Sequence, residues 1–497
     1  MKRPLTLRRI VLAAGALALG GLLLGVLARA LLTGFAVRAL LESAGASEIR
    51  FAVAQATPWR VEVADLDFRV RTQSFGAKRI TLARDHWWSP TLGRVSVEQA
   101  RVPLNLDGSD TNPWDWATYR NGQVSASPAR LPVDEITVDG QLLVQAAALP
   151  EQALAVKARA RLAGPGRWEV QAEAAGPGLA LQAAGSYDLG QDALEFQVTE
   201  AALDLQPWQQ FVQRLVVLPG GDWELAGRLT GRAQGRWAGS ELAVGGEVAL
   251  ADGRVRYARR DVTAEGIEAR LDIKDLPRLV TKPGTLRVRE IRVGQLTLAA
   301  LDAEVAFESR ERIVVPRLSL AALGGTVAAE PFRYTLSQRV LEAAVTVDGI
   351  SIEQVMALTR DLPAQATGRV DGRFPIRLDD SGLRLGTGWL ALQPGVYAEV
   401  QFNATGLLTR GVAPGHPSYA VLKKIESGLL KLKIGELRLD IRPPDAPPGR
   451  TAQLHLTGSP VDPDVKAPVI LDLNVNGPLE KLLNLGFDSR VSFGTKP

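Results

Sequence analysis

The sequence is dominated by short runs in which apolar and polar residues alternate one by one. RVEVADLDFRV at residues 60–70 is an early example and DEITVDGQLLVQ at residues 134–145 a later one. Successive side chains of a β-strand point to opposite faces, so an alternation with a period of two predicts strands. Between residues 227 and 347 about a dozen such runs follow one another with hardly any helical signal, which is the pattern of an all-β chain.

Such strands have one apolar face, and that face has to be covered. The sequence offers few helices to cover it. Two sheets could pack face to face as a sandwich, or one long sheet could fold over on itself around something apolar. At ~4.8 Å per strand, roughly 25 to 30 strands side by side would extend over ~120–140 Å. The fold class that we expect is mainly β, a long antiparallel sheet folded into a groove (a β-taco) with a few short helices.

Four segments carry helical signals, which are apolar residues three or four apart, a capping box, or a Pro near the start with a Gly behind. They are Gln206–Pro219, Ser351–Asp361, His416–Gly428 and Gly477–Gly486. In the second segment the capping box consists of Ser351 and Gln354. We expect each to form a brief helix between groups of strands.

The run Ile10–Ala28 contains nineteen residues without a charged or strongly polar side chain. As a helix it is long enough to cross a hydrocarbon core of ~30 Å. Four basic residues precede it, and basic residues stay on the cytoplasmic side. The sequence predicts a cytoplasmic tail at 1–9, a transmembrane helix at 10–28 and export of the remainder.

A cleaved signal peptide is the alternative, because Ala28-Arg29-Ala30 imitates a cleavage site. The apolar core of a signal peptide has only ~7–15 residues, which is shorter than this run. The apolar pattern also continues through residues 31–41, which favours a juxtamembrane helix over residues 29–47.

Composition and motifs argue against nucleic-acid binding, metal binding and enzymatic catalysis by this chain. The 58 basic and 54 acidic residues are interspersed and give a net charge of +4, so no nucleic-acid surface is indicated. There is no cysteine, and the three histidines, His86, His416 and His455, are scattered. Neither a GxSxG nor a phosphate-binding loop is present. Two pairs of carboxylates, at residues 65 and 67 and at 379 and 380, stand at strand or turn positions typical of solvated residues. We expect no enzyme, no metal site and no cofactor.

From about Leu286 onward the sequence resembles a known family. The similarity rests on GRFPIRLDDSGLRLGTGWLALQPGVYAEV at residues 372–400, LLKLKIGELRLDI at 429–441 and APVILDLNVNGPLEKLL at 467–483. These motifs are similar to those of the AsmA-like intermembrane lipid-transport proteins, most closely the YdbH group, whose carboxy-terminal region is called a dicarboxylate-transport domain. Weaker similarity appears at residues 86–104 and 112–119.

The resemblance implies an inner-membrane helix, a periplasmic β-groove with an apolar interior, and transfer of phospholipid toward the outer membrane. It also implies a small outer-membrane lipoprotein as a partner at the carboxy-terminal end. The groove would comprise an amino-terminal part at 48–285 and a YdbH-like part at 286–497. The chain is short for the group, and Ser459-Pro460 replaces the family's Asn-Pro turn.

Two functions remain open at this point. One is a membrane-anchored periplasmic lipid conduit, and the other is an envelope scaffold that binds client proteins by β-strand addition. For the conduit, two strands supply the expected lining. Apolar residues are at even numbers before Gly435-Glu436 and at odd numbers after it, so a bulge there would place both sets on one face. The expected lining residues are Leu430, Leu432, Ile434, Leu437, Leu439, Ile441, Val469, Leu471, Leu473 and Val475.

Overall fold

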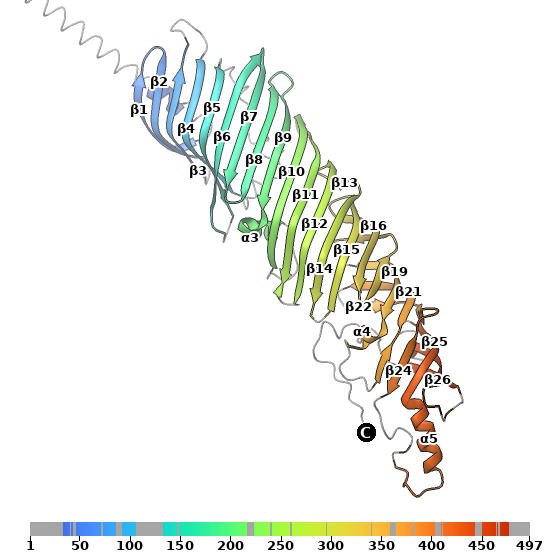
Figure 1. The fold of residues 1–497 in the computed structure, drawn as a ribbon. Helices are drawn as coiled ribbons and strands as arrows, with labels where there is room; N and C mark the ends of the chain where they lie inside the picture. The colour runs from blue at the N-terminus through green and yellow to red at the C-terminus, as the bar shows by residue number, and fades with distance from the viewer. Residues whose placement is uncertain are drawn as a thin grey trace, which may run out of the picture. The chain divides into compact units, whose positions relative to one another are not determined.

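A computed structural model describes the following residues of the 497-residue chain: 33–39, 41–42, 46–70, 73–85, 92–105, 133–146, 149–215, 223–238, 241–258, 261–294, 296–338, 340–357, 364–379, 382–402, 409, 411–442, 450–463, 465 and 468–476. Within them the chain forms 27 strands, which belong to one hydrogen-bonded sheet (Figure 1). The prediction of a mainly β chain with a few short helices is confirmed.

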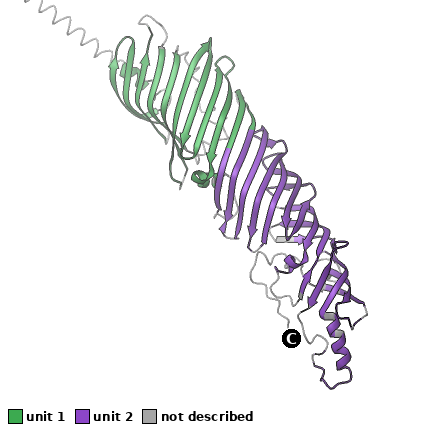
Figure 2. Cartoon of the chain, viewed as in Figure 1, with its two compact units in different colours: residues 1–215, 230–246 green, residues 216–229, 247–497 purple. Residues whose placement is uncertain are grey.

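The chain divides into two compact units (Figure 2). Unit 1 comprises Met1–Leu215 and Thr230–Gly246, and unit 2 comprises Val216–Leu229 and Glu247–Pro497. Unit 1 contains β1 (Ala46–Ala56), β2 (Arg60–Val70), β3 (Gln73–Ala83), β4 (Leu92–Asn105), β5 (Val133–Gln145), β6 (Gln152–Gly164), β7 (Arg167–Gly176), β8 (Leu179–Asp188) and β9 (Ala193–Asp204). Strands β10 (Trp223–Ala238) and β11 (Glu241–Tyr257) contribute residues to both units.

Unit 2 contains the remaining strands and two helices. The strands are β12 (Val262–Asp275), β13 (Val280–Thr281), β14 (Gly284–Val293), β15 (Leu296–Phe307), β16 (Arg312–Ala322), β17 (Gly325–Ala329), β18 (Phe332–Thr335), β19 (Val340–Ser351), β20 (Ala364–Thr367), β21 (Arg369–Asp379), β22 (Gly382–Leu385), β23 (Gly388–Leu392), β24 (Ala398–Phe402), β25 (Lys431–Ile441), β26 (Arg450–Pro460) and β27 (Val469–Asn476).

Neighbouring strands of unit 1 pair in sequence order from β1 to β9. All of these pairings are antiparallel except β4 with β5, which is parallel. A parallel pair cannot be closed by a tight hairpin and needs a crossover. The residues that join these two strands, 106–132, lie outside the described part of the chain.

Several strands share an irregularity that keeps their apolar residues on one face. In β2 the buried residues Val63 and Leu66 are three apart, because Asp65 between them has a φ of 47°. Strands β12 and β15 of unit 2 contain the same irregularity, a residue with positive φ. Gly266 has a φ of 64° and Ala300 a φ of 48°. Bulges of this kind bend a strand locally and correct its register. The apolar residues of these strands therefore stay on one face of the sheet although their spacing changes from two to three at the bulge.

Three of the predicted helices are found. They are α3 (Leu205–Leu215), α4 (Ile352–Ala357) and α5 (Tyr419–Leu430). The capping box contributes to α4, since the backbone N–H of Gln354 donates to Ser351 Oγ at 3.4 Å. Gly428 was expected to end α5 but lies inside it. A Cβ at this position would come within 2.9 Å of Val465 Cγ1, so the glycine permits close packing instead.

The amino-terminal predictions are only partly within the described residues. Residues 33–39 and 41–42 are helical, and β1 begins at Ala46. The predicted membrane span Ile10–Ala28 and the predicted helix Gly477–Gly486 lie outside the described residues. Among the residues that are described, no helix is both long and apolar enough to span a bilayer.

An open apolar face as the candidate functional site

Strands β6 to β9 of unit 1 present an apolar face on which most side chains are only half-buried, with Leu154 of β6 as a buried exception. In β7, Trp168, Val170, Ala172 and Ala174 alternate with exposed charged or polar residues, yet none of the four is fully buried. The same alternation of half-buried and exposed positions continues in β6 and β8. The apolar side of a sheet normally packs against a second layer of structure. Here it remains accessible.

The strand register arranges this face by side-chain size. Ala158, Ala172 and Ala183 stand opposite one another in β6, β7 and β8 and form what we call the alanine track. On one side of it runs a row of large residues, Leu162, Trp168, Tyr187 and Leu194. On the other side are Leu142, Leu154, Leu179 and Leu203.

The alanine track lies between two rows of larger side chains. Leu154 and Leu162 are eight residues apart in β6, which corresponds to ~26 Å along a strand. Alanine side chains reach less far from the backbone than leucine or tryptophan, so the track carries shorter side chains than the two outer rows. The register therefore produces a track that runs across the strands rather than along them.

Helix α3 covers one edge of the face. Its Trp208 and Phe211 are buried and pack with Val144 and with Leu154, a member of the second row. The indole N–H of Trp208 donates to the carbonyl oxygen of Pro177 at 2.8 Å, which fixes the helix to the turn between β7 and β8. The sequence forms a helix here because the apolar residues of α3 recur at helical spacing.

The opposite face of the same strands is polar and internally paired. Arg161 stands opposite Glu169, and Lys157 opposite Glu173, so charges of opposite sign meet across strands. Glu135 of β5 accepts hydrogen bonds from Arg94 at 3.0 Å and Arg159 at 2.6 Å. Burial acts to raise the pKa of Glu135, but these two guanidinium groups outweigh it and hold the pKa below its usual value.

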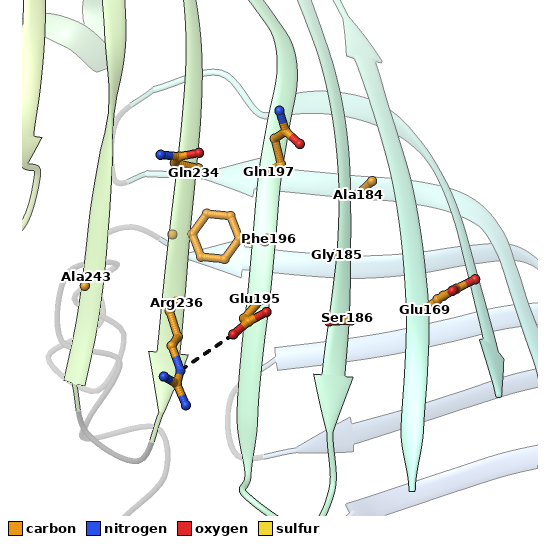
Figure 3. Close-up of a pocket in the computed structure, with 11 residues that line it drawn as sticks. Glu169, Ala184, Gly185, Ser186, Glu195, Phe196, Gln197, Gln234, Arg236 and Ala243 are labelled. Carbon is orange, nitrogen blue, oxygen red and sulfur yellow. Dashed lines mark ion pairs between the residues drawn. The ribbon is translucent and has the colours of Figure 1, made fainter. Parts of the chain in front are cut away.

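The depression drawn in Figure 3 lies mainly on this polar face. Glu169, Glu195, Gln197 and Gln234 contribute to its lining, and Arg236 approaches Glu195 at 4.0 Å. An open hollow with this polar lining is not suited to an acyl chain. The apolar face is the better candidate site.

The ten predicted lining residues belong to β25, β27 and the end of α5 in unit 2. The expected bulge is present, since Ile434 pairs with Gly458 while Glu436 pairs with Thr457. Leu432 is completely buried, and Ile434 and Ile441 are nearly so. Leu430 and Leu439 are half-buried. The backbones of Leu473 and Val475 pair with β26.

Around these residues the apolar face is filled by the protein itself. Leu432 and Ile434 form a cluster with Ala366, Ala398, Val400 and Leu456. Leu437, Val469 and Leu471 pack against this cluster, together with Ile352 and Met356 from α4. The structure therefore brings the predicted residues together, but in a packed environment. Their role as lipid lining remains a prediction.

Sequence reasoning did not select the alanine track. The signal was present in the segments ALAVKARARL, RWEVQAEAAG and LALQAAGSYD, where Ala repeatedly occupies the apolar positions of three successive strands. Alanine is a weak indicator of a strand, and its significance depends on the register that aligns the three segments.

Of the three histidines, His416 and His455 lie within the described residues and make local contacts, whereas His86 lies outside them. His455 Nδ1 lies 2.7 Å from Asp472 Oδ1 on the polar face of β26, and this contact raises the pKa of His455. His416 Nδ1 accepts the backbone N–H of Ser418 at 3.2 Å. Among the described residues, no three His, Cys, Asp or Glu are placed to hold a metal ion.

A comparison with protein families decides the relationship. The model described as YdbH-like, intermembrane phospholipid transport protein YdbH, matches residues 120–396, which is more than half of the chain. The chain belongs to the YdbH-like family. The matched residues include β5 to β9 and thus the whole alanine track, whereas the motifs in β25 and β27 lie beyond the match. No match was found among the curated proteins or the solved structures.

Proposed function

We propose that this protein carries phospholipids between two membranes, with acyl chains lying on the apolar face of its sheet and headgroups in water. The observation that carries the proposal is that the apolar side chains of β7, and most of those of β6 and β8 on the same face, are only half-buried. Exposed apolar surface costs about 25 cal/mol per Å², and a soluble protein rarely exposes a patch of more than a few hundred Å² without a partner. Acyl chains would cover this surface.

The chemistry of the face suits movement as well as binding. The alanine track offers no charge and no hydrogen-bonding group beyond the backbone, so a bound chain is held by non-directional contacts. Such contacts can be exchanged for equivalent ones a few ångströms further on without breaking a specific bond. A lipid can therefore shift from strand to strand.

We further propose the location implied by the family resemblance. Residues 10–28 would anchor the protein in the inner membrane of a bacterium with the amino terminus in the cytoplasm, and the sheet would lie in the periplasm. Its carboxy-terminal end would meet a small outer-membrane lipoprotein. This location would place the apolar face between a donor and an acceptor membrane.

The test is the lipid content of the full-length protein. We expect phospholipid to copurify in gentle detergent and to be detected by mass spectrometry. Ala172→Glu places a charge on the track, and we expect roughly tenfold less bound lipid because a carboxylate next to an acyl chain is strongly unfavourable. Gln171→Glu, one residue away on the exposed polar face, is the matched control and should retain lipid.

Complete absence of phospholipid from the unmodified protein would contradict the proposal. So would equal lipid loss from both variants. The scaffold function makes the opposite prediction in a cross-linking experiment, in which photoreactive groups at the outer edge of β1 would capture client proteins while groups on the track capture no lipid.

A further inference from the structure

The two edges of the apolar face in unit 1 are chemically different. One edge is covered by α3. There Trp208 and Phe211 are buried, and the indole N–H of Trp208 donates a hydrogen bond to the carbonyl oxygen of Pro177. The other edge has no such helix among the described residues. It carries the row of Trp168 and Tyr187, which stand opposite each other in β7 and β8.

A third aromatic residue extends this row. A Cβ at Gly235 of β10 would lie 2.6 Å from Cζ of Phe196, so the Phe196 ring lies over Gly235. Strand β10 pairs with β9. Trp237 is two residues beyond Gly235, toward the same edge, and is half-buried on the same face. Trp168, Tyr187 and Trp237 are called the aromatic rim below.

The hydroxyl group of Tyr187 lies at the strand ends, beside the turn that connects β8 to β9. The Tyr187 ring lies on the apolar face, and its hydroxyl lies 2.7 Å from Oδ1 of Asp192 in the turn at the edge. The indole N–H of Trp168 has no hydrogen-bond partner among the described residues. Tyrosine and tryptophan with an apolar body and a polar tip are the residues that collect at membrane interfaces. Arg167, next to Trp168 in the sequence, is exposed on the opposite, polar face of β7, where its guanidinium donates to Ser186 Oγ at 3.4 Å.

We infer that the aromatic rim is the binding site for the glycerol-phosphodiester region of the transported lipid. This inference rests on the proposed function and adds the orientation of the lipid. The headgroup lies at the rim, near the turns of residues 164–167 and 188–192, and the acyl chains point across the alanine track toward α3. The Trp168 N–H is the rim donor available to a phosphate or ester oxygen.

The orientation can be read from the positions of photo-adducts. Full-length protein is reconstituted in vesicles of phosphatidylethanolamine and phosphatidylglycerol that contain a trace of phosphatidylethanolamine with a diazirine either on the headgroup or at an acyl terminus. Adducts are then located by mass spectrometry. We expect headgroup adducts at the rim and its two turns, and acyl adducts at Ala172, Ala183 and the buried side of α3.

Headgroup adducts on α3 at a yield equal to or above that of the rim would overturn the inference while acyl adducts on the track still supported the proposed function. If the acyl probe leaves the apolar face unlabelled, the proposed function itself has failed.

A pair of variants tests the donor. Trp168→Phe keeps an aromatic ring but removes the N–H, and we expect roughly three- to tenfold less headgroup labelling at the rim, as for the loss of one hydrogen bond. Acyl labelling at Ala172 should persist, which shows that the face is intact. Phe196→Leu changes a large residue without a polar group and should leave headgroup labelling unchanged. Equal labelling in Trp168→Phe and the unmodified protein would remove the Trp168 N–H from the site.

Discussion

Strands β6 to β9 of unit 1 and strands β24 to β26 of unit 2 follow the same alternating pattern but treat their apolar faces differently. In β7 no apolar side chain is fully buried, whereas in β25 Leu432 is completely buried and Ile434 is 4% exposed. The difference lies in side-chain size and in cover. Leucine, isoleucine and valine pack against residues of α4 in the second region, while the alanines of β7 in the first region are only half-buried. Alternation alone does not decide whether a sheet is filled or open.

The largest expected effect is the loss of stability caused by a charge in the filled region. We expect Leu432→Glu to destabilise unit 2 by more than about 4 kcal/mol, because it buries an unpaired carboxylate and removes a packed side chain. Thermal unfolding and limited proteolysis measure the effect. Lys433→Gln, one residue away on the exposed face, should remain close to the unmodified protein. A folded Leu432→Glu protein would show that this region is open as well.

A charge at the margin of the filled region should act on lipid rather than on folding. Leu471 packs against the cluster but is only half-buried, so a carboxylate there can reach water. We expect Leu471→Glu to abolish lipid transfer between vesicles with protein levels near normal. Asn474→Glu on the exposed face should change neither quantity. Loss of the Leu471→Glu protein from the cell would instead assign Leu471 to the packed core.

Larger side chains on the alanine track should make the open region resemble the filled one, with less apolar surface left for lipid. In the triple variant Ala158→Leu, Ala172→Leu, Ala183→Leu, three larger side chains occupy the space proposed for acyl chains. We expect the bound phospholipid to fall to roughly half or less, with stability unchanged or slightly higher because more apolar surface is covered. Quantitative lipid analysis and thermal unfolding test both parts. Unchanged lipid content would mean that the lipid lies elsewhere.

The smallest expected effect concerns the polar face of β26. The hydrogen bond and the charge of Asp472 raise the pKa of His455, so the folded protein binds the proton more tightly than the unfolded chain. The resulting stability is present below the unfolded value of about 6.5 and is lost as pH rises through the folded pKa. The pair is exposed, so a slight change in melting temperature between about pH 6 and pH 8 is expected. His455→Asn should remove this difference, and a variant that keeps it would refute the assignment.

Local features were predictable wherever neighbouring residues determine them. Ser351 and Gln354 predicted α4, and the shift from even to odd apolar positions predicted the bulge of β25. Features that depend on distant segments were not. Gly428 was expected at a helix end, but its environment is set by Val465. The parallel pairing of β4 with β5 could not be predicted, because the alternation within each strand is the same for parallel and antiparallel neighbours.

The same reason explains the outcome for the candidate site. In β25 and β27 large apolar residues alternate clearly with polar ones, which is why the sequence analysis selected them. Large apolar side chains also fill the space between strands and helix, so these residues pack against other residues of the protein. An open face requires smaller residues aligned over several strands. Ala158, Ala172 and Ala183 become one feature only through the pairing register, which a single sequence does not reveal.

The central claim is that lipid covers the apolar face of β6 to β9, and the absence of cysteine from the chain allows a direct test. Single-cysteine variants are made at Ala172 on the track, Gln171 on the polar face and Leu432 in the filled region, and each is treated with a water-soluble maleimide before and after delipidation. We expect Gln171→Cys to react in both states, Leu432→Cys to be protected in both, and Ala172→Cys to be protected only while lipid is bound. Equal reactivity of Ala172→Cys in the two states would contradict the proposed lipid binding.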